Sequence, residues 1–291
     1  MKKLFFVTLL ILSAMLLLSG CGIPVYSAIP VEESGLTVYF IDVGQADSAL
    51  VVCEGAAMLI DGGNAADSSL IYTFLKDRGI SYLDYIVATH AHEDHVGGLS
   101  GALNYATAGV ALSPVKEYDT KAFGNFIKYL SEQSVQVTIP SPGDSFKLGG
   151  ADIVIIGSNS AEDANDSSIV IKLTYGSTVF LFTGDAGRPA EQVILDNGFD
   201  ISSDVLKVGH HGSDSSTTYP FLREIMPRYA VISCGEDNQY GHPHENTLSR
   251  LRDAGVTLFR TDMQGTITAC SDGNTVTFTV ERNPDAITNP T

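Results

Sequence analysis

Three histidines and an aspartate stand within six residues of one another, immediately after an apolar segment that ends at Thr89. The four residues are His90, His92, Asp94 and His95. Imidazole nitrogens and carboxylate oxygens are the ligands that zinc, manganese and iron prefer. A solvated polar loop is the alternative, but so many ligand groups in one short segment need a partner to offset their desolvation. The pattern therefore predicts a metal site, in which His90 and His92 share one ion and Asp94 and His95 share a second.

We expect one or two divalent ions at this site, with zinc favoured and manganese as the alternative. A bound ion lowers the pKa of a coordinated water to about 7, and the resulting hydroxide attacks an ester. Asp94 is placed to align that water. Two ions about 3.5–4 Å apart would also clamp a phosphodiester for in-line attack. The residues thus predict a metal-dependent hydrolase, with esters of phosphoric acid as the favoured substrates.

The overall charge limits the substrate. The 291 residues include 34 acidic and 17 basic side chains, which gives a formal net charge of −17. A broad nucleic-acid groove draws its affinity from many lysines and arginines, and this composition disfavours one. A bound ion can still accept a single phosphodiester.

The N-terminus has the features of an export signal. Lys2 and Lys3 precede an apolar run over residues 4–18 that is short for a membrane-crossing helix. The segment Leu18-Ser19-Gly20-Cys21 resembles the bacterial lipobox, in which cleavage before the cysteine frees it for lipid attachment. An ordinary cleaved signal with an incidental cysteine is the alternative. We therefore expect a signal peptide over 1–20, a tether over 21–34, and a protein lipid-anchored through Cys21 on the extracellular side of the cytoplasmic membrane.

The remaining chain has two β-rich halves, each interrupted by amphipathic helices. We expect one domain over 35–283 and a C-terminal tail over 284–291. The expected strands are 36–42, 48–53, 57–61, 83–89, 110–112, 135–139, 151–156, 168–174, 178–183, 204–208, 229–233, 257–260, 266–270 and 276–281. The expected helices are 68–78, 97–105, 121–133, 189–197, 217–226 and 245–254. This order predicts an α+β fold, a four-layer αββα sandwich.

The histidine-rich motif resembles that of the metallo-β-lactamase superfamily, and the resemblance extends over nearly all of the chain after Cys21. Further matching segments are 40–47, 59–63, 183–185, 206–213, 240–244 and 260–265. Together they are similar to the branch represented by the soluble domain of the ComEC DNA-uptake channel and by cell-wall phosphorylcholine esterases. The resemblance implies a phosphodiester substrate, either DNA or a cell-wall phosphodiester, and no protein partner can be inferred.

The resemblance also assigns roles to later residues. Asp185 would bridge the two ions; on local grounds alone a helix N-cap is favoured, but bridging is favoured beside the first cluster. One of His210 and His211 would complete the second ion's ligands, and the other would contact substrate; we favour His210 as the ligand. The catalytic set is then Asp94, His211 and His242. A structural histidine is the alternative for either member of the pair.

Other candidates would support the ligands or contact substrate. Asp61 would orient the histidine cluster through hydrogen bonds, or else is a turn residue, and Asp47 belongs to the same group. His242 and His244 would reach the pocket rim, where one of them binds substrate or the first ion. Many superfamily members supply another histidine before the bridging aspartate, but this chain has none between His95 and His210. The first ion would then be completed by Asn165, Asp166, His242 or water.

Two other functions remain open from the sequence. One is a non-catalytic ligand-binding lipoprotein on a hydrolase scaffold, which would have lost metal ligands. The other is a different activity on the same fold, such as a thioesterase, a lactamase or a redox enzyme. Cys53, Cys234 and Cys270 lie in apolar segments without C-x-x-C pairing, and we assign them no chemistry.

Overall fold

The side chains of one strand pack into two different hydrophobic cores, because alternate residues of a strand point to opposite faces of its sheet. In β1 (Leu36–Phe40), Leu36, Val38 and Phe40 pack between the two sheets, whereas Tyr39 packs against helices. The computed structural model describes residues 35–158 and 161–289. The predicted signal peptide, the tether and the lipid-attachment residue Cys21 lie outside these ranges. Within them, no helix combines the length and the apolar character needed to cross a membrane.

The first sheet contains eight strands within the described residues, and the half from β3 to β6 is parallel. Their spatial order is β15 (Val276–Val280), β14 (Ile267–Ser271), β1, β2 (Ala49–Cys53), β3 (Ala56–Ile60), β4 (Tyr82–Val87), β5 (Thr107–Leu112) and β6 (Val137–Thr138). Each of these strands falls on a segment predicted as a strand, although some of their ends differ by up to three residues.

The second sheet contains seven strands within the described residues, and β10 to β13 are parallel. Their spatial order is β13 (Thr257–Arg260), β12 (Tyr229–Ile232), β11 (Val205–Lys207), β10 (Thr178–Phe182), β9 (Val170–Tyr175), β8 (Ala151–Gly157) and β7 (Ser145–Leu148). The sequence pattern did not predict β7, an edge strand that pairs with β8.

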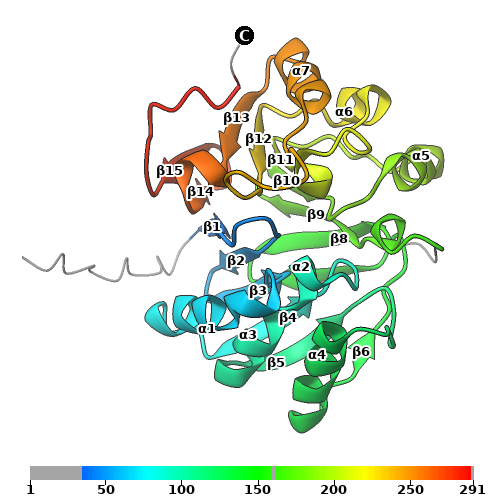
Figure 1. Cartoon of the computed structure of the whole chain (residues 1–291), viewed down its shortest axis with the longest axis vertical. Helices are drawn as coiled ribbons and strands as arrows, with labels where there is room; N and C mark the ends of the chain where they lie inside the picture. Colours follow the sequence, from blue (N-terminus) through cyan, green and yellow to red (C-terminus); the bar gives the residue numbers. More distant parts are fainter. Residues whose placement is uncertain (1–34, 159–160, 290–291) are drawn as a thin grey trace, which may run out of the picture.

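Helices cover the outer face of each sheet (Figure 1). The helices are α1 (Ser68–Asp77), α2 (Glu93–Val96), α3 (Leu99–Tyr105), α4 (Lys121–Glu132), α5 (Arg188–Asn197), α6 (Tyr219–Ile225), α7 (Glu245–Asp253) and α8 (Thr261–Gln264). Helices α1, α3 and α4 bury apolar residues against the first sheet, and α5, α6 and α7 against the second. A third core lies between the sheets. The predicted four-layer αββα fold is confirmed.

Two local expectations need correction. The helix predicted over 97–105 begins only at Leu99, as α3, and a separate single-turn helix that was not predicted, α2, precedes it inside the histidine-rich motif. The expected helix at 217–226 begins only at Tyr219. In addition, residues of the predicted C-terminal tail pack on the domain, since the Thr288 hydroxyl donates to the Leu258 carbonyl of β13 at 2.6 Å.

The topology gathers the chemistry-bearing segments at one edge. Parallel strands β3 and β4 of the first sheet, and β10, β11 and β12 of the second, are each followed by one of these segments. The carboxyl ends of neighbouring parallel strands meet at the same edge of a sheet, which is where open α/β sheets bind ligands. This edge is therefore the place to look for a site.

Candidate metal centre

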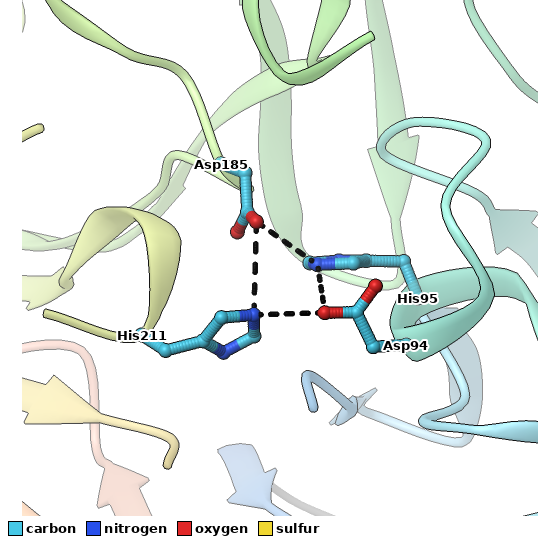
Figure 2. Close-up of side chains that lie close together, drawn as sticks. All are labelled: Asp94, His95, Asp185 and His211. Carbon is cyan, nitrogen blue, oxygen red and sulfur yellow. Dashed lines mark hydrogen bonds and ion pairs between the residues drawn. The ribbon is translucent and has the colours of Figure 1, made fainter. Parts of the chain in front are cut away.

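Four side chains from three segments converge at this edge (Figure 2). Asp94 and His95 come from α2, Asp185 follows β10, and His211 follows β11. One potential ligand atom from each lies within 4.8 Å of the others. Oδ2 of Asp185 is 3.3 Å from Nε2 of His95 and 3.6 Å from Nε2 of His211. Nε2 of His211 is also 3.2 Å from Oδ2 of Asp94, so the four donor atoms surround a common point.

Asp61 fixes the orientation of His95. Its Oδ2 is 2.9 Å from Nδ1 of His95 and accepts the Thr89 hydroxyl at 2.7 Å, while its Oδ1 accepts the Thr89 backbone N–H at 2.8 Å. Because a carboxylate can only accept, Nδ1 of His95 donates and its Nε2 is left to face Asp185 and Asp94. The hydrogen-bonding role expected for Asp61 is what the contacts describe.

Close backbone packing holds these two segments together. Gly62 donates its N–H to the His95 carbonyl at 2.7 Å, and Gly98 donates to the Gly63 carbonyl at 3.1 Å. A Cβ on Gly98 would lie 1.9 Å from the Gly62 carbonyl oxygen, and a Cβ on Gly62 would lie 2.5 Å from the Leu99 nitrogen. Only glycine at both positions lets α2 and α3 approach the end of β3 this closely.

A backbone carbonyl fixes the ring orientation and tautomer of His211, as Asp61 does for His95. Its Nδ1 is 3.0 Å from the Ser233 carbonyl oxygen, which can only accept, so Nδ1 carries a hydrogen and Nε2 faces the cluster. Metal-binding histidines almost always donate their other ring N–H to a carboxylate or carbonyl. His95 and His211 both show this arrangement.

The cluster is strongly charged and almost dry. Burial lowers the pKa of His211, but the carboxylates of Asp185 and Asp47 outweigh it and raise that pKa to about 10. Burial likewise opposes protonation of His95, yet Asp185 and Asp61 hold its pKa well above the usual range. In the same way burial disfavours ionised Asp185, but His95 and His211 keep its pKa well below normal. The carboxylates therefore favour positive charge at this point, which a bound cation would also supply.

The donor set fits a divalent metal ion. Oδ1 of Asp185 and Nε2 of His95 are buried without a hydrogen-bond partner among residues 35–158 and 161–289. Buried polar atoms in proteins are nearly always paired, so two such atoms in one cluster call for a ligand. Two imidazole nitrogens with carboxylate oxygens are a ligand set typical of zinc, and also suit manganese and iron.

His90 and His92 form a second pair beside the cluster. Nε2 of His90 is 3.1 Å from Nδ1 of His92 and 4.0 Å from Oδ2 of Asp185. Burial, and then the charge of His95, hold the pKa of His90 well below its usual range, so its ring is neutral and available as a ligand. Asp185 therefore lies between the two histidine pairs, in the position expected of a bridging carboxylate.

The structure places His211, and not His210, among the four converging side chains. Both residues have left-handed backbone, with φ of 49° and 53°, and their side chains diverge. His211 is buried, whereas the side chain of His210 is 26% exposed and its Nε2 is 3.7 Å from Oδ2 of Asp185. These contacts favour His211 over His210 as the ligand of the second ion, and the ring of His210 lies at the more exposed side of the cluster.

A sequence profile described as the Metallo-beta-lactamase superfamily matches residues 41–236. The chain belongs to the metallo-beta-lactamase superfamily. It is 29% identical over 271 residues to ComE operon protein 3 of Bacillus subtilis, in a match that covers 86% of this chain and 35% of that protein. It is 31% identical over 258 residues to competence protein ComA of Neisseria gonorrhoeae, with 87% and 35% covered. The chain thus spans about a third of these curated relatives.

Among solved structures, the fold resembles the metallo-beta-lactamase fold protein YhfI from Bacillus subtilis, with a TM-score of 0.53 at 12% identity. The match covers 82% of this chain and 100% of the other. At this identity the likeness supports the fold alone. The site residues must therefore be argued from their own contacts, on this metallo-beta-lactamase scaffold.

Gln45, which the sequence pattern did not single out, controls the tautomer of His242. The Gly235 backbone N–H donates to Oε1 of Gln45, so its Nε2 amide donates to Nδ1 of His242 at 3.2 Å. Burial and then the positive His211 lower the pKa of His242 to about 4, so the ring is neutral with its hydrogen on Nε2. His242 is thereby set up as a hydrogen-bond donor and not as a metal ligand through Nδ1.

His244 does not share this position. Its Nδ1 accepts the Asp214 backbone N–H at 3.1 Å and its Nε2 donates to the Tyr240 carbonyl at 3.1 Å. Both ring nitrogens are therefore used to hold the loop before α7. The rim role considered for His244 falls to His242.

The segment in place of the superfamily's additional histidine contributes no nitrogen ligand. Oδ1 of Asp166 accepts the Gly187 backbone N–H at 3.1 Å, which ties this segment to the loop after Asp185. Oδ1 of Asn165 is buried without a hydrogen-bond partner in the described part of the chain. Of the two, Asn165 has a buried oxygen without a hydrogen bond that could bind an ion, whereas Oδ1 of Asp166 already binds the Gly187 backbone N–H.

Lys207 is a further charged residue of the centre, to which the sequence pattern gave no role. It is buried at the end of β11, with its ammonium 2.8 Å from Oδ2 of Asp47. Burial disfavours ionised Asp47, but Lys207 and then His211 lower its pKa to about 2. A lysine within an apolar strand was the available signal, because buried lysines are rare without a partner.

Proposed function

We propose that this protein is a metal-dependent phosphodiesterase, nuclease-like in its chemistry, that works outside the cytoplasmic membrane. The observation that carries the proposal is the convergence of Asp94, His95, Asp185 and His211 within 4.8 Å, with two buried polar atoms that make no hydrogen bond among the described residues. A purely structural ionic cluster would pair its buried atoms, whereas a ligand set keeps them for a cation.

The residues divide between two ions that share one carboxylate. Asp94, His95 and His211 would hold one ion, His90 and His92 would hold the other, and Asp185 would bridge them. Such ions supply an activated water nucleophile and neutralise the negative charge that develops on a phosphodiester. The ion at His90 and His92 has only these two histidines, and Asn165 is the residue best placed in sequence to add a ligand, as the superfamily's additional histidine is missing.

Two side chains would act on the substrate directly. The Asp94 side chain is 32% exposed, the most open of the four. Burial raises the pKa of Asp94, but the charge of His95 outweighs this effect and keeps that pKa below the usual range. Ionised Asp94 can therefore orient a water at the open side. His242, as a neutral Nε2–H donor, can hydrogen-bond a phosphoryl oxygen or the leaving oxygen, the role that preorganised donors take in stabilising a transition state.

The substrate class is inferred from the relatives and from the net charge. One relative is named a competence protein, which together with the resemblance to the ComEC branch makes DNA the first candidate, and phosphorylcholine-like wall phosphodiesters are the second. The net charge of −17 favours a short or locally held strand over a long polyanion. The lipobox-like segment ending at Cys21 is the basis for placing the protein on the outer side of the membrane through a lipid anchor.

The test is metal content of the purified full chain, together with hydrolysis of bis-p-nitrophenyl phosphate. We expect one to two zinc or manganese ions per chain and turnover that chelation removes and zinc restores. Single-stranded DNA and a choline-phosphodiester substrate should then be compared at equal concentration. A folded chain that neither binds zinc or manganese nor hydrolyses the ester would overturn the proposal and favour a ligand-binding lipoprotein.

A further inference from the structure

Lys207 is a buried lysine close to the candidate metal centre, linked to it through Asp47. It is 4% exposed, and its ammonium donates to Oδ2 of Asp47 at 2.8 Å and to the Val208 carbonyl at 3.0 Å. Ordering and desolvating a lysine is costly, and a well-packed apolar residue would serve a core equally well. Its presence on β11, between two sheets and close to the ligands, therefore suggests a role beyond packing.

Its partner Asp47 joins the ligand segments of the two halves. The Asp47 backbone N–H donates to the Asp94 carbonyl at 3.1 Å, and its own carbonyl accepts the Gly63 N–H at 2.8 Å. On the other side, Oδ1 of Asp47 is 3.3 Å from Nδ1 of His211. One residue thus contacts the loop that follows β3, the helix that carries Asp94, and the histidine that follows β11.

The two carboxylate oxygens of Asp47 have separate tasks. Lys207 binds Oδ2, and this contact leaves Oδ1 directed at the His211 ring. Oδ1 is buried and makes no contact that meets hydrogen-bond geometry in the described residues, so the ion pair with Lys207 is what holds the group in place. Rotation of this carboxylate would remove one of the two acceptors beside Nδ1 of His211.

We infer that Lys207 is a positioning residue for the metal ion held by His211, acting through Asp47. The lysine fixes the carboxylate, the carboxylate and the Ser233 carbonyl fix the imidazole, and the imidazole presents Nε2 to the ion. This inference rests on the proposed metal site. Residues that hold a metal ligand from behind typically change metal affinity about 10- to 100-fold when they are replaced.

A simple charge effect predicts the opposite sign. Lys207 is a cation paired with Asp47, whose other carboxylate oxygen lies beside His211, and it would repel a metal ion that His211 binds. If charge alone mattered, Lys207→Met would bind zinc more tightly, and Lys207→Arg would resemble the unchanged protein. Positioning predicts weaker binding in both, because the larger, planar guanidinium does not reproduce the contact of a compact ammonium.

The experiment measures zinc affinity by competition with a chelator for the full chain and for Lys207→Met, Lys207→Arg, Asp47→Asn and the Lys207→Met/Asp47→Asn double variant. Lys172→Met is the matched control, since Lys172 pairs with Asp200 on the second sheet away from the centre. Melting temperatures without metal report folding. We expect a loss of about 10- to 100-fold in each single variant, a double variant no weaker than the worse single one, and no change in the control.

The outcomes separate this inference from the proposed function. If the unchanged protein binds no zinc, the metal site itself is refuted, and the inference with it. If it binds zinc and folded Lys207→Met binds equally or more tightly, Lys207 is not a positioning residue. Should Lys207→Met fail to fold, near-isosteric Asp47→Asn decides: unchanged affinity in that variant overturns the inference, and a loss supports it.

Discussion

Oδ2 of Asp185 lies 3.3 Å from Nε2 of His95, and the same oxygen is within 4.0 Å of Nε2 of three other histidines. These are His90, His210 and His211. Two of the four histidines come from the segment after β4 in the first sheet, and two from the segment after β11 in the second. One carboxylate oxygen therefore lies close to the histidines that follow strands of both sheets, and both proposed ions would depend on Asp185.

We expect Asp185→Asn to lose metal at both positions, because an amide oxygen bridges two cations poorly. Zinc affinity should fall at least about 100-fold, with turnover of bis-p-nitrophenyl phosphate lost in parallel. Asp200→Asn is the control, as Asp200 is an exposed aspartate of the same half. Elemental analysis and the ester assay check both quantities. A variant that keeps full metal content would show that Asp185 does not bridge.

The two adjacent histidines should differ in effect. His211→Ala removes a buried ring held by the Ser233 carbonyl and should release one ion per chain. His210→Ala removes a partly exposed ring and should keep the metal content, with an effect confined to kinetic constants. Metal content of the two variants, measured side by side, checks this. Equal loss in both, or loss only in His210→Ala, would reverse the assignment.

Most of the fold could be predicted from the sequence because strands of this chain are apolar and regularly interrupted by turn residues. Edge strand β7 could not, since it has only four residues and only Leu148 of them is buried, so its alternation of polar and apolar residues is too short to indicate a strand. Helix α2 was missed because it is a single turn whose residues were interpreted as ligands in a loop. In both cases tertiary contacts, and not local propensity, decide the structure.

The site was only partly predictable for a related reason. The ligand types and the strand ends that carry them are visible in the sequence. Which of His210 and His211 turns inward depends on two consecutive left-handed backbone conformations and on a carbonyl from the end of β12, which no local pattern encodes. The partnerships of Gln45 with His242 and of Lys207 with Asp47 join residues more than 150 positions apart.

The stability of the metal-free protein should depend on pH. In the metal-free protein the pKa of His95 is raised, and that of His211 is raised to about 10, from an ordinary value near 6.5. A raised pKa in the folded state stabilises the protein fully below the unfolded value and ceases to do so as pH rises through the folded one. The metal-free protein should therefore lose stability from about pH 6.5 to 10, while the metal-loaded protein should not.

At pH 8, zinc binding to the rings of His95 and His211 should release protons. Both rings are protonated without metal, so an ion that takes their Nε2 atoms must displace protons. Zinc titrations by calorimetry in two buffers of different ionisation enthalpy should show net release of at least one proton per chain. His211→Asn should release fewer. A heat of binding that does not depend on the buffer would contradict the protonated metal-free cluster.

His242 should matter for turnover and not for metal. His242→Ala removes a neutral N–H donor held by Gln45, and we expect kcat/KM to fall about 100-fold with unchanged metal content. Gln45→Leu should act in the same direction to a smaller extent, because the tautomer is then free. Tyr240→Phe is the control, since it keeps the ring stacked 5.6 Å from His242. Loss of metal in His242→Ala would instead make it a ligand.

The glycine contact behind the cluster should be sensitive to a single methyl group. In Gly98→Ala the new Cβ would lie 1.9 Å from the Gly62 carbonyl oxygen, so the backbone of α2 and α3 must move away from β3. We expect a loss of about 3 kcal/mol in the free energy of unfolding, at the upper end for overpacking.

Gly124→Ala is the matched control, because Gly124 lies in α4 and a Cβ added there meets nothing within 4 Å. Alanine should stabilise that helix by about 0.5–1 kcal/mol. Urea unfolding of the metal-free variants measures the two changes in free energy. Because Gly98 adjoins α2, Gly98→Ala should also bind zinc more weakly. Equal stability of the two alanine variants would show that the contact between Gly62 and Gly98 is not tight, and that the close backbone approach does not require glycine at position 98.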